Sequence, residues 1–408
     1  MSRGSPLLLS SLVIACLALL AGCPRSTGPP GGPTTGPGAG ATTPKASGGG
    51  EIVLGVYMCN TGPFATFGQS STKAMQLATE EINAVGGVLG KQIKLIVEDD
   101  QCKPEEAANA AQKLIQQDQV LCVLGEVASS NSLAAAPICQ RAQTPMVTPS
   151  STNPAVTKTG DYIFRVCFTD DFQGLVMSKF ATEKLTAKTA VIFSDVASDY
   201  SKGLSSVFKA TFTADGGKIL GEESYNQGDK DFRAQLTKFR DLDPDVMYVP
   251  GYYGEVALIL SQARQLGLKA IGIGGDGWDS PKLVEIAGKA AEGGCFSNHY
   301  SKDDPNPVVR QFVQTFQAKY NEVPDALAAC AYDAVRIVAQ AIKSANKVDR
   351  TALRDALAQV KDFDGVTGKI TIDQDRNARK SATILTIKNG KQTFVQTMAP
   401  PLRTASSR

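Results

Sequence analysis

From residue 51 onward, short apolar runs alternate with longer segments whose apolar residues recur every three or four positions. A run at 52–58 precedes a segment at 70–85 with helical spacing, which Gly86-Gly87 ends. A second run at 92–98 precedes another helical segment, which begins at Pro104. Such regular alternation predicts βαβ units, and therefore a parallel sheet covered by helices on both faces.

The alternation then repeats in a second set of similar size, so we predict one α/β set at about 51–169 and another at about 170–300. A predicted strand at 162–166 leads to a predicted helix at 172–185. Further strands are predicted at 191–194, 246–249 and 271–274, and further helices at 201–214, 231–239 and 255–266. Later helices are expected at 308–320, 326–345 and 351–360, and strands at 369–372, 383–387 and 393–396. Asn389-Gly390 joins the last two strands and is a hairpin signal. This order indicates that the chain returns to both sets.

Two hydroxyl-rich loops lie in the stretch 125–154. Ser129 follows a predicted buried strand at 120–124, close to where a helix should begin, and Ser150, Ser151 and Thr152 follow a short strand at 145–147. Loops at the carboxyl ends of neighbouring parallel strands are where open α/β sheets bind ligands, and a helix start favours an anion. Caps and turns use the same residue types, so these loops alone leave both interpretations open.

The first 23 residues are not expected to belong to the fold. Arg3 precedes an apolar run at 7–20 that is typical of a secretory leader and short for a membrane span. The sequence LAGC at 20–23 resembles the bacterial lipobox, in which the cysteine is lipidated. We therefore predict a signal peptide at 1–22 and an anchor at Cys23.

Residues 24–50 contain nine glycines and six prolines and no large apolar residue, which predicts a disordered tether. The membrane would then be reached through the lipid only. Charge is nearly balanced, at 42 Lys+Arg against 40 Asp+Glu, and no basic cluster is present. Nucleic acid is therefore not an expected partner.

Seven cysteines follow Cys23, an odd number for an exported protein. Cys59 and Cys102 end the first two predicted strands, so a disulfide between them is plausible if those strands are neighbours. Cys122 and Cys330 lie in apolar runs typical of small buried residues. The sequence leaves the connectivity open.

The residue types that most enzymes need are missing. His299 is the only histidine, it lies outside the polar loops described above, and the chain has no G-x-S-x-G elbow. Neither a dinucleotide fingerprint nor a phosphate-binding loop is present, and no metal-ligand spacing of His and Cys occurs. Asp99-Asp100 alone is more typical of capping than of cation binding. We therefore expect a binding protein, not an enzyme, with no cofactor and no metal.

Eight ordered fragments resemble the branched-chain amino-acid (leucine/isoleucine/valine) substrate-binding proteins of ABC importers. They are TGPFATFGQ at 61–69, AVGGVLGKQIKL at 84–95, EDDQCKPEEA at 98–107, TPSSTNPAVT at 148–157, SDYSKGL at 198–204, DKDF at 229–232, DVMYVPGYYGE at 245–255 and AEGG at 291–294. The resemblance covers 51–398. It implies the type I periplasmic-binding fold: two doubly wound parallel-sheet lobes joined by three hinge crossovers. The expected first lobe is 51–169 plus 302–378, the second is 170–301 plus 379–398, and 399–408 is a flexible tail.

The resemblance also implies a site between the lobes. In the first lobe, Ser129 matches the family's carboxylate-binding serine, and Thr152 matches a threonine that binds both charged groups of an amino acid. Ser150 matches the residue whose backbone carbonyl accepts from the ammonium, and Phe67 matches an aromatic residue that flanks the ligand. In the second lobe, the matches are the aromatics Tyr200 and Tyr252 and the acidic ammonium partner Asp276. A buried zwitterion needs partners for both charges, and this set supplies them. Asp276 could instead be a turn residue, the two tyrosines ordinary packing residues, and Trp278 either a pocket wall or part of the core.

Two departures from the family pattern concern the ligand and the disulfide. Ala128 stands where the family often has a cysteine, which makes Cys59 the candidate partner for Cys102. Asp276 is a carbon shorter than the usual glutamate, and Phe67 lacks a hydroxyl.

The predicted function is an exported, lipid-anchored and monomeric receptor that faces the periplasm or lies on the outer face of the membrane. It would deliver a branched-chain or other apolar amino acid to a permease in the inner membrane. The alternatives are a receptor for an amide, urea or aromatic carboxylate, and a sensor lipoprotein.

Overall fold

The computed structural model describes residues 50–400. The predicted leader 1–22, Cys23, the predicted tether up to residue 49 and residues 401–408 of the predicted tail lie outside the described residues. Among the helices of the described part, none is both long and apolar enough to cross a membrane.

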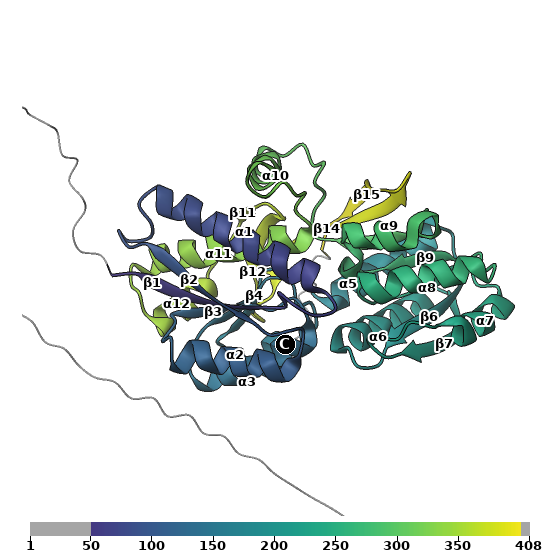
Figure 1. Ribbon diagram of the computed structural model, residues 1–408, viewed down its shortest axis with the longest axis horizontal. Helices are drawn as coiled ribbons and strands as arrows, with labels where there is room; N and C mark the ends of the chain where they lie inside the picture. The colour runs from purple at the N-terminus through teal and green to yellow at the C-terminus, as the bar shows by residue number, and fades with distance from the viewer. Residues whose placement is uncertain (1–49, 401–408) are drawn as a thin grey trace, which may run out of the picture. The chain divides into compact units, whose positions relative to one another are not determined.

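The first lobe contains a five-stranded parallel sheet with the strand order β2-β1-β3-β4-β5. Its strands are β1 (Ile52–Met58), β2 (Ile93–Asp99), β3 (Cys122–Leu124), β4 (Met146–Thr148) and β5 (Ile163–Arg165). Helices α1 (Ala65–Ala84) and α11 (Ala326–Ala345) lie on one side of this sheet, and α2 (Pro104–Gln116) and α3 (Ser129–Arg141) on the other (Figure 1). Helix α11 is alanine-rich and buried along most of its length, as expected for a helix enclosed by other elements.

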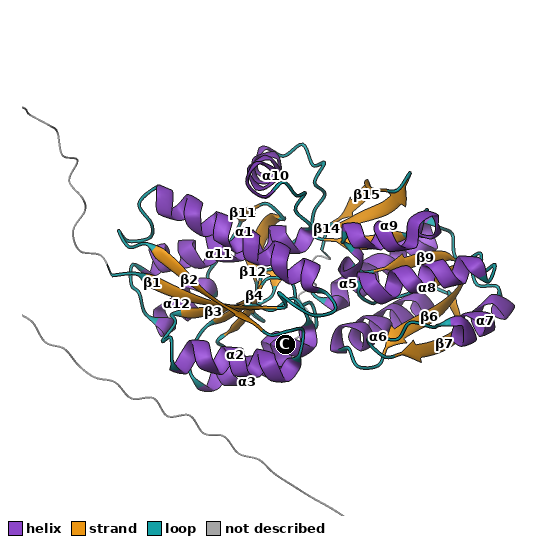
Figure 2. Ribbon diagram, viewed as in Figure 1, coloured by secondary structure: helices purple, strands orange, loops and turns teal. Residues whose placement is uncertain are grey.

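The second lobe contains a seven-stranded mixed sheet with the order β15-β14-β10-β9-β8-β6-β7. Its strands are β6 (Thr189–Asp195), β7 (Lys218–Tyr225), β8 (Val246–Tyr248), β9 (Ile271–Gly274), β10 (Cys295–Asn298), β14 (Ala382–Lys388) and β15 (Lys391–Met398). Its helices are α5 (Asp170–Lys179), a π-helical turn (Phe180–Lys184), α6 (Asp199–Ala214), α7 (Arg233–Leu242), α8 (Tyr253–Gln265) and α9 (Pro281–Ala287). Figure 2 shows the helices flanking the strands.

The part of the chain that returns to the first lobe forms two helices and a small sheet. They are α10 (Pro307–Tyr320), α12 (Arg350–Leu357), and the sheet of β11 (Phe363–Gly365), β12 (Gly368–Ile372) and β13 (Ala378–Arg379). Helix α10 packs against α1, and α12 packs against α11. The short helix α4 (Ala155–Lys158) precedes this part and lies between β4 and β5.

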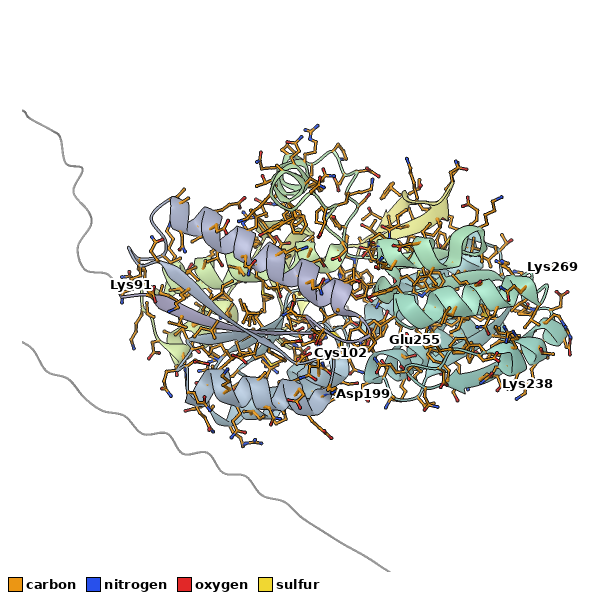
Figure 3. The ribbon with its side chains drawn as sticks, viewed as in Figure 1. Lys91, Cys102, Asp199, Lys238, Glu255 and Lys269 are labelled. Atoms are coloured by element: carbon orange, nitrogen blue, oxygen red, sulfur yellow. A yellow bond between two sulfur atoms is a disulfide. The ribbon has the colours of Figure 1, made fainter. Side chains whose placement is uncertain are left out.

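The chain passes between the two lobes three times: from β5 to α5, from β10 to α10, and from β13 to β14. The lobes also touch directly. Asp199, labelled in Figure 3, receives a hydrogen bond from the Ser130 hydroxyl at 3.0 Å, and the Asn153 side chain donates to the Asp199 carbonyl at 2.8 Å. These bonds join the start of α6 to the two hydroxyl-rich loops of the first lobe.

Most predicted elements are present. Strands β7, β10, β11 and β13 and helices α4 and α9 were not predicted, since β7 is largely polar and the others have seven residues or fewer. The helix expected at 172–185 begins at Asp170 and ends in the π-helical turn. The second sheet is not fully parallel, because the predicted hairpin forms its antiparallel strands β14 and β15.

Candidate functional site

The two hydroxyl-rich loops of the first lobe lie together at the carboxyl ends of β3 and β4. Ser129 is the first residue of α3, and its hydroxyl accepts a hydrogen bond from the Asn153 N–H at 3.2 Å. Ser150 and Thr152 are buried. Among the described residues, the Ser150 hydroxyl has no hydrogen-bond partner, and Thr152 Oγ1 makes no hydrogen bond of normal geometry. We call Ser129, Ser150 and Thr152 the first wall.

The backbone behind the first wall is held by groups that the sequence analysis did not identify. The hydroxyls of Thr148 and Ser151 both donate to the Glu126 carbonyl, at 2.7 and 2.8 Å. The buried Arg165 guanidinium donates to the carbonyls of Ser151 and Asn153, at 2.6 and 2.7 Å. These bonds fix both loops and leave the Ser150 and Thr152 hydroxyls as the uncommitted groups.

The second lobe places Tyr200, Tyr252 and Asp276 together, and we call them the second wall. Asp276 opens a short turn after β9, Tyr200 lies in α6, and Tyr252 immediately precedes α8. The Tyr200 hydroxyl donates to Asp276 Oδ1 at 2.9 Å. The rings of Tyr200 and Tyr252 are stacked, with centroids 5.4 Å apart.

Two further residues orient Asp276. His299 Nε2 lies 2.9 Å from Asp276 Oδ2, and the Asp276 N–H donates to the Gln173 side chain at 2.9 Å. Burial lowers the pKa of His299, and the adjacent Asp276 carboxyl opposes that shift. A neutral imidazole that donates from Nε2 keeps Nδ1 as an acceptor, and no described residue donates to this buried atom. The only histidine of the chain therefore supports the second wall, although the sequence analysis placed it outside the polar loops.

A second acid, Asp170, interacts with both walls. The Asp170 N–H donates to the Thr152 carbonyl at 2.9 Å. Burial raises the pKa of the Asp170 carboxyl to about 8; the Thr152 hydroxyl lowers this pKa and the Asp276 carboxyl raises it. Asp170 therefore interacts electrostatically with both walls.

The predicted aromatic residues Phe67 and Trp278 lie in different lobes and make different contacts. Phe67 is buried and meets Tyr253 edge-on, with ring centroids 5.0 Å apart. Phe64, three residues earlier, is the ring that stacks on Tyr252, at 4.4 Å. Trp278 is fully buried, and its Nε1–H donates to the Val249 carbonyl at 2.9 Å, which places it in the core of the second lobe.

A disulfide joins Cys59 to Cys102 close to the first wall. The Glu126 carboxyl lies beside it and accepts hydrogen bonds from the N–H groups of Cys59 and Ala128, at 3.0 and 2.5 Å. Burial, with the nearby Asp100 carboxyl as the second cause, raises the pKa of Glu126 well above its ordinary range. Cys59, Asp100 and Glu126 are close enough together to suggest a metal site, but the Cys59 sulfur is already bonded to Cys102.

Two α/β lobes joined by three crossovers, with hydroxyls from one lobe and an oriented carboxylate from the other, define a two-lobed solute-binding protein. Comparison with known proteins agrees. A family model described as a periplasmic binding protein matches residues 51–392. The chain belongs to this family, which consists of solute-binding proteins and not of enzymes.

The individual relatives that the chain resembles are also solute-binding proteins. The chain is 33% identical to a leucine-, isoleucine-, valine-, threonine- and alanine-binding protein of Pseudomonas aeruginosa, over 77% of this chain and 83% of the relative. A leucine-binding protein of Thermotoga maritima is 42% identical, with a TM-score of 0.82 over 86% of this chain and 99% of that one. A branched-chain amino-acid substrate-binding protein of Streptococcus pneumoniae, solved with isoleucine, is 37% identical, with a TM-score of 0.81 over the same shares. The family resemblance and the fold class predicted from the sequence are thus confirmed.

Proposed function

We propose that this protein captures an amino acid with an aliphatic side chain between its two lobes and delivers it to an ABC importer. The Asp276 carboxylate is the main support for this proposal. It is buried, it accepts from Tyr200 and His299, and its backbone is fixed by Gln173. A carboxylate oriented in this way is suited to a ligand ammonium group, because charge-assisted hydrogen bonds are strong where water is excluded.

The first wall would bind the other end of the ligand. The Ser150 and Thr152 hydroxyls are buried without normal hydrogen bonds, and a buried polar group without a partner costs about 1–3 kcal/mol. A ligand carboxylate would accept from these hydroxyls and from N–H groups at the start of α3, where Ser129 lies. Neutral donors at one end and an acid at the other match a zwitterion.

The ligand side chain would lie against aromatic rings. Phe64, Tyr252 and Tyr200 form a continuous stack across the lobe boundary, with centroid separations of 4.4 and 5.4 Å. These ring faces offer apolar contact and no further charge, which favours an aliphatic side chain over a polar one. Phe67, which packs on Tyr253, would support this stack from the first lobe.

The cellular setting is extracytoplasmic, as for the family. We further propose that Cys23 is lipidated, that this lipid is the only membrane attachment, and that the protein works as a monomer with an ABC permease. Globomycin treatment of expressing cells tests the anchor, since it should leave an uncleaved precursor that still contains residues 1–22. Processing that continues unchanged would contradict lipidation.

Isothermal titration with leucine tests the site. Asp276→Ala and Thr152→Ala should each weaken binding at least tenfold, which corresponds to about 1.4 kcal/mol. Asp241→Ala, an exposed acid of the same lobe, is the matched control and should bind as the parent does. Unchanged affinity in both site variants would refute the assignment. Asp276→Asn distinguishes an amino-acid ligand from a carboxylate ligand that has no ammonium group. The substitution should weaken binding of the first and should not weaken binding of the second.

A further inference from the structure

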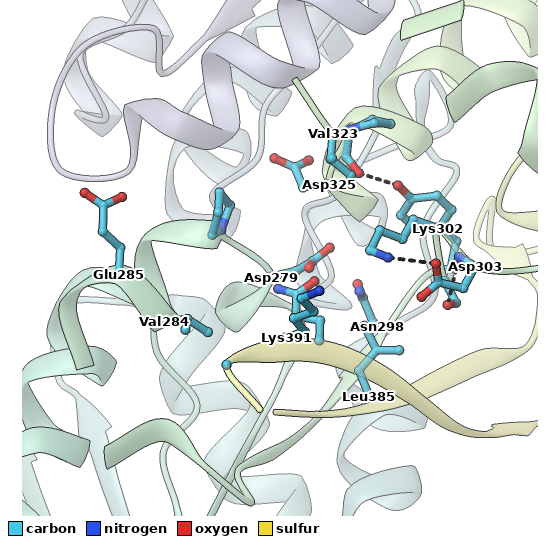
Figure 4. A pocket seen from close by; sticks show the side chains of 16 residues that line it. Asp279, Val284, Glu285, Asn298, Lys302, Asp303, Val323, Asp325, Leu385 and Lys391 are labelled. Carbon is cyan, nitrogen blue, oxygen red and sulfur yellow. Dashed lines mark hydrogen bonds and ion pairs between the residues drawn. The ribbon is translucent and has the colours of Figure 1, made fainter. Parts of the chain in front are cut away.

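A pocket lies away from the two walls, where both lobes and one crossover meet. Its volume is about 310 Å³, at the lower end of the range for small-molecule sites. The second lobe contributes α9, β10 and the β14-β15 hairpin, the crossover contributes residues 300–303, and the first lobe contributes residues 323–325 at the start of α11. We call this the hinge pocket (Figure 4).

Two buried acids line the hinge pocket, Asp279 and Asp325. Asp279 Oδ2 accepts from the Ala326 N–H at 2.7 Å, and Asp325 accepts from the Ala328 N–H and the Ser70 hydroxyl, at 2.7 and 2.5 Å. Within the described residues neither acid forms an ion pair. Burial raises the pKa of both, and the Asp279 carboxyl helps to raise that of Asp325 to about 7. A buried carboxylate without a cation is costly, so a cationic ligand would find two uncompensated partners here.

A third group points independently to a ligand. Asn298 is fully buried and lines the pocket, and Figure 4 shows its amide beside the Asp279 carboxyl. Its Oδ1 accepts from the His299 N–H at 2.9 Å, but its Nδ2 makes no hydrogen bond of normal geometry to any described residue. This Nδ2 is close enough to Asp279 to lower that acid's pKa, and it remains available to donate to an oxygen atom.

The rest of the lining sets the charge and shape of a ligand. The pocket has four acidic and two basic side chains, and Lys302 is already paired with Asp303 at 2.7 Å. The other cation, Lys391, is exposed and is not within ion-pair distance of either buried acid. Val284, Val323 and Leu385 supply apolar surface, and Val323 is 51% exposed at the pocket mouth.

We propose that the hinge pocket binds a small organic ammonium ion with an apolar body. The ammonium group would lie beside Asp279 and Asp325, the hydrocarbon would contact Val284, Val323 and Leu385, and a ligand oxygen, where present, would accept from Asn298 Nδ2. This site is separate from the two walls and needs no ligand carboxylate.

Occupancy of the hinge pocket would also favour one arrangement of the lobes. Its walls come from both lobes and from a crossover, and they form the pocket while Ser130 and Asp199 are in contact. A ligand that binds this arrangement preferentially stabilises it, and the coupling to a second ligand is reciprocal. We therefore expect the amine to raise the affinity of the protein for leucine. This expected coupling rests on the proposed function, whereas amine binding itself does not.

The test is a titration of the full-length protein with 3-methylbutylammonium chloride, which has an aliphatic body and lacks the carboxylate that the first wall would bind. Saturable binding is expected. Asp279→Asn should weaken it at least tenfold, and so should Val323→Lys, which places a like charge at the exposed pocket mouth without disturbing a buried residue. Glu285→Gln, an exposed acid of the same pocket, is the matched control and should change affinity less than twofold.

Three further measurements decide the outcome. The uncharged 3-methylbutanol should bind at least tenfold more weakly than the amine. Thr152→Ala should leave amine binding intact while it weakens leucine, so that failure of the proposed function stays distinct from failure of this site. The proposal is overturned if the amine does not bind, if Val323→Lys leaves its affinity unchanged, or if Thr152→Ala abolishes it.

Discussion

The two walls of the candidate site hold their polar groups in opposite ways. In the first wall the backbone is fixed, by Arg165 and by hydroxyl groups bonded to the Glu126 carbonyl, while the Ser150 and Thr152 hydroxyls remain uncommitted. In the second wall the functional side chain itself is fixed, because Tyr200 and His299 bond both oxygens of Asp276.

This difference follows from the charge that each wall would meet. A carboxylate can be bound by several neutral donors whose positions depend on the backbone. An ammonium group needs an ionised acid, and an acid in a buried place must be solvated by the protein even when no ligand is bound. Mutations should therefore affect folding mainly through the supports of the first wall, and binding mainly through the side chains of the second.

The largest effect should come from Arg165→Met, which tests whether the first wall depends on its support. Loss of the guanidinium removes the charged donors of the Ser151 and Asn153 carbonyls, which keep weaker ones, and this should lower the free energy of unfolding by about 3 kcal/mol or more. Urea unfolding measures this. Arg310→Met, at an exposed position of α10, is the control and should change stability by less than about 0.5 kcal/mol. Equal stability of the two variants would mean that Arg165 does not hold the loops.

Tyr200→Phe should have a smaller effect, and chiefly on binding. It removes the hydroxyl that donates to Asp276 Oδ1 and keeps the ring. A hydrogen bond to a charged group contributes about 1.5–3 kcal/mol, so leucine should bind roughly tenfold more weakly. The matched control is Tyr248→Phe, since the Tyr248 hydroxyl is buried in the same lobe and bonds to no residue in the described part of the chain. If both variants bind leucine equally, the Tyr200 hydroxyl does not set the strength of the second wall.

The contrast between the two walls also explains which residues of the site could be predicted from the sequence. The first wall lies on loops that directly follow buried strands, so Ser129, Ser150 and Thr152 could be found from local patterns alone. The second wall and the supports of both walls depend on contacts between distant segments: Gln173 bonds Asp276 across 103 positions, and Arg165 resembles an ordinary strand residue until its partners are known. Nothing near His299 in the sequence indicates that it meets Asp276.

The fold shows the same division between local and distant information. Strands with continuous apolar runs, such as β1 and β8, were predicted because burial on both faces leaves that pattern. Strand β7 is an edge strand with the sequence KILGEESY and is mostly half-buried or exposed, so it has no apolar run to detect. Its place in the sheet comes from pairing with β6, which a local pattern does not reveal.

The smallest effect on folding, and the sharpest test of the comparison, comes from Ser150 of the first wall and its neighbour Ser151. The Ser150 hydroxyl has no hydrogen-bond partner among residues 50–400, whereas the Ser151 hydroxyl bonds the Glu126 carbonyl and lies 2.7 Å from the Ser132 hydroxyl. Ser150→Ala should therefore leave the free energy of unfolding unchanged or raise it slightly, while Ser151→Ala should lower it by about 1 kcal/mol. Leucine affinity should change in the opposite order: Ser150→Ala should weaken binding threefold to tenfold, and Ser151→Ala should weaken it less. Urea unfolding and isothermal titration on the same two variants measure both quantities, and a stability loss in Ser150→Ala that matches Ser151→Ala would show that the uncommitted hydroxyl has a structural role after all.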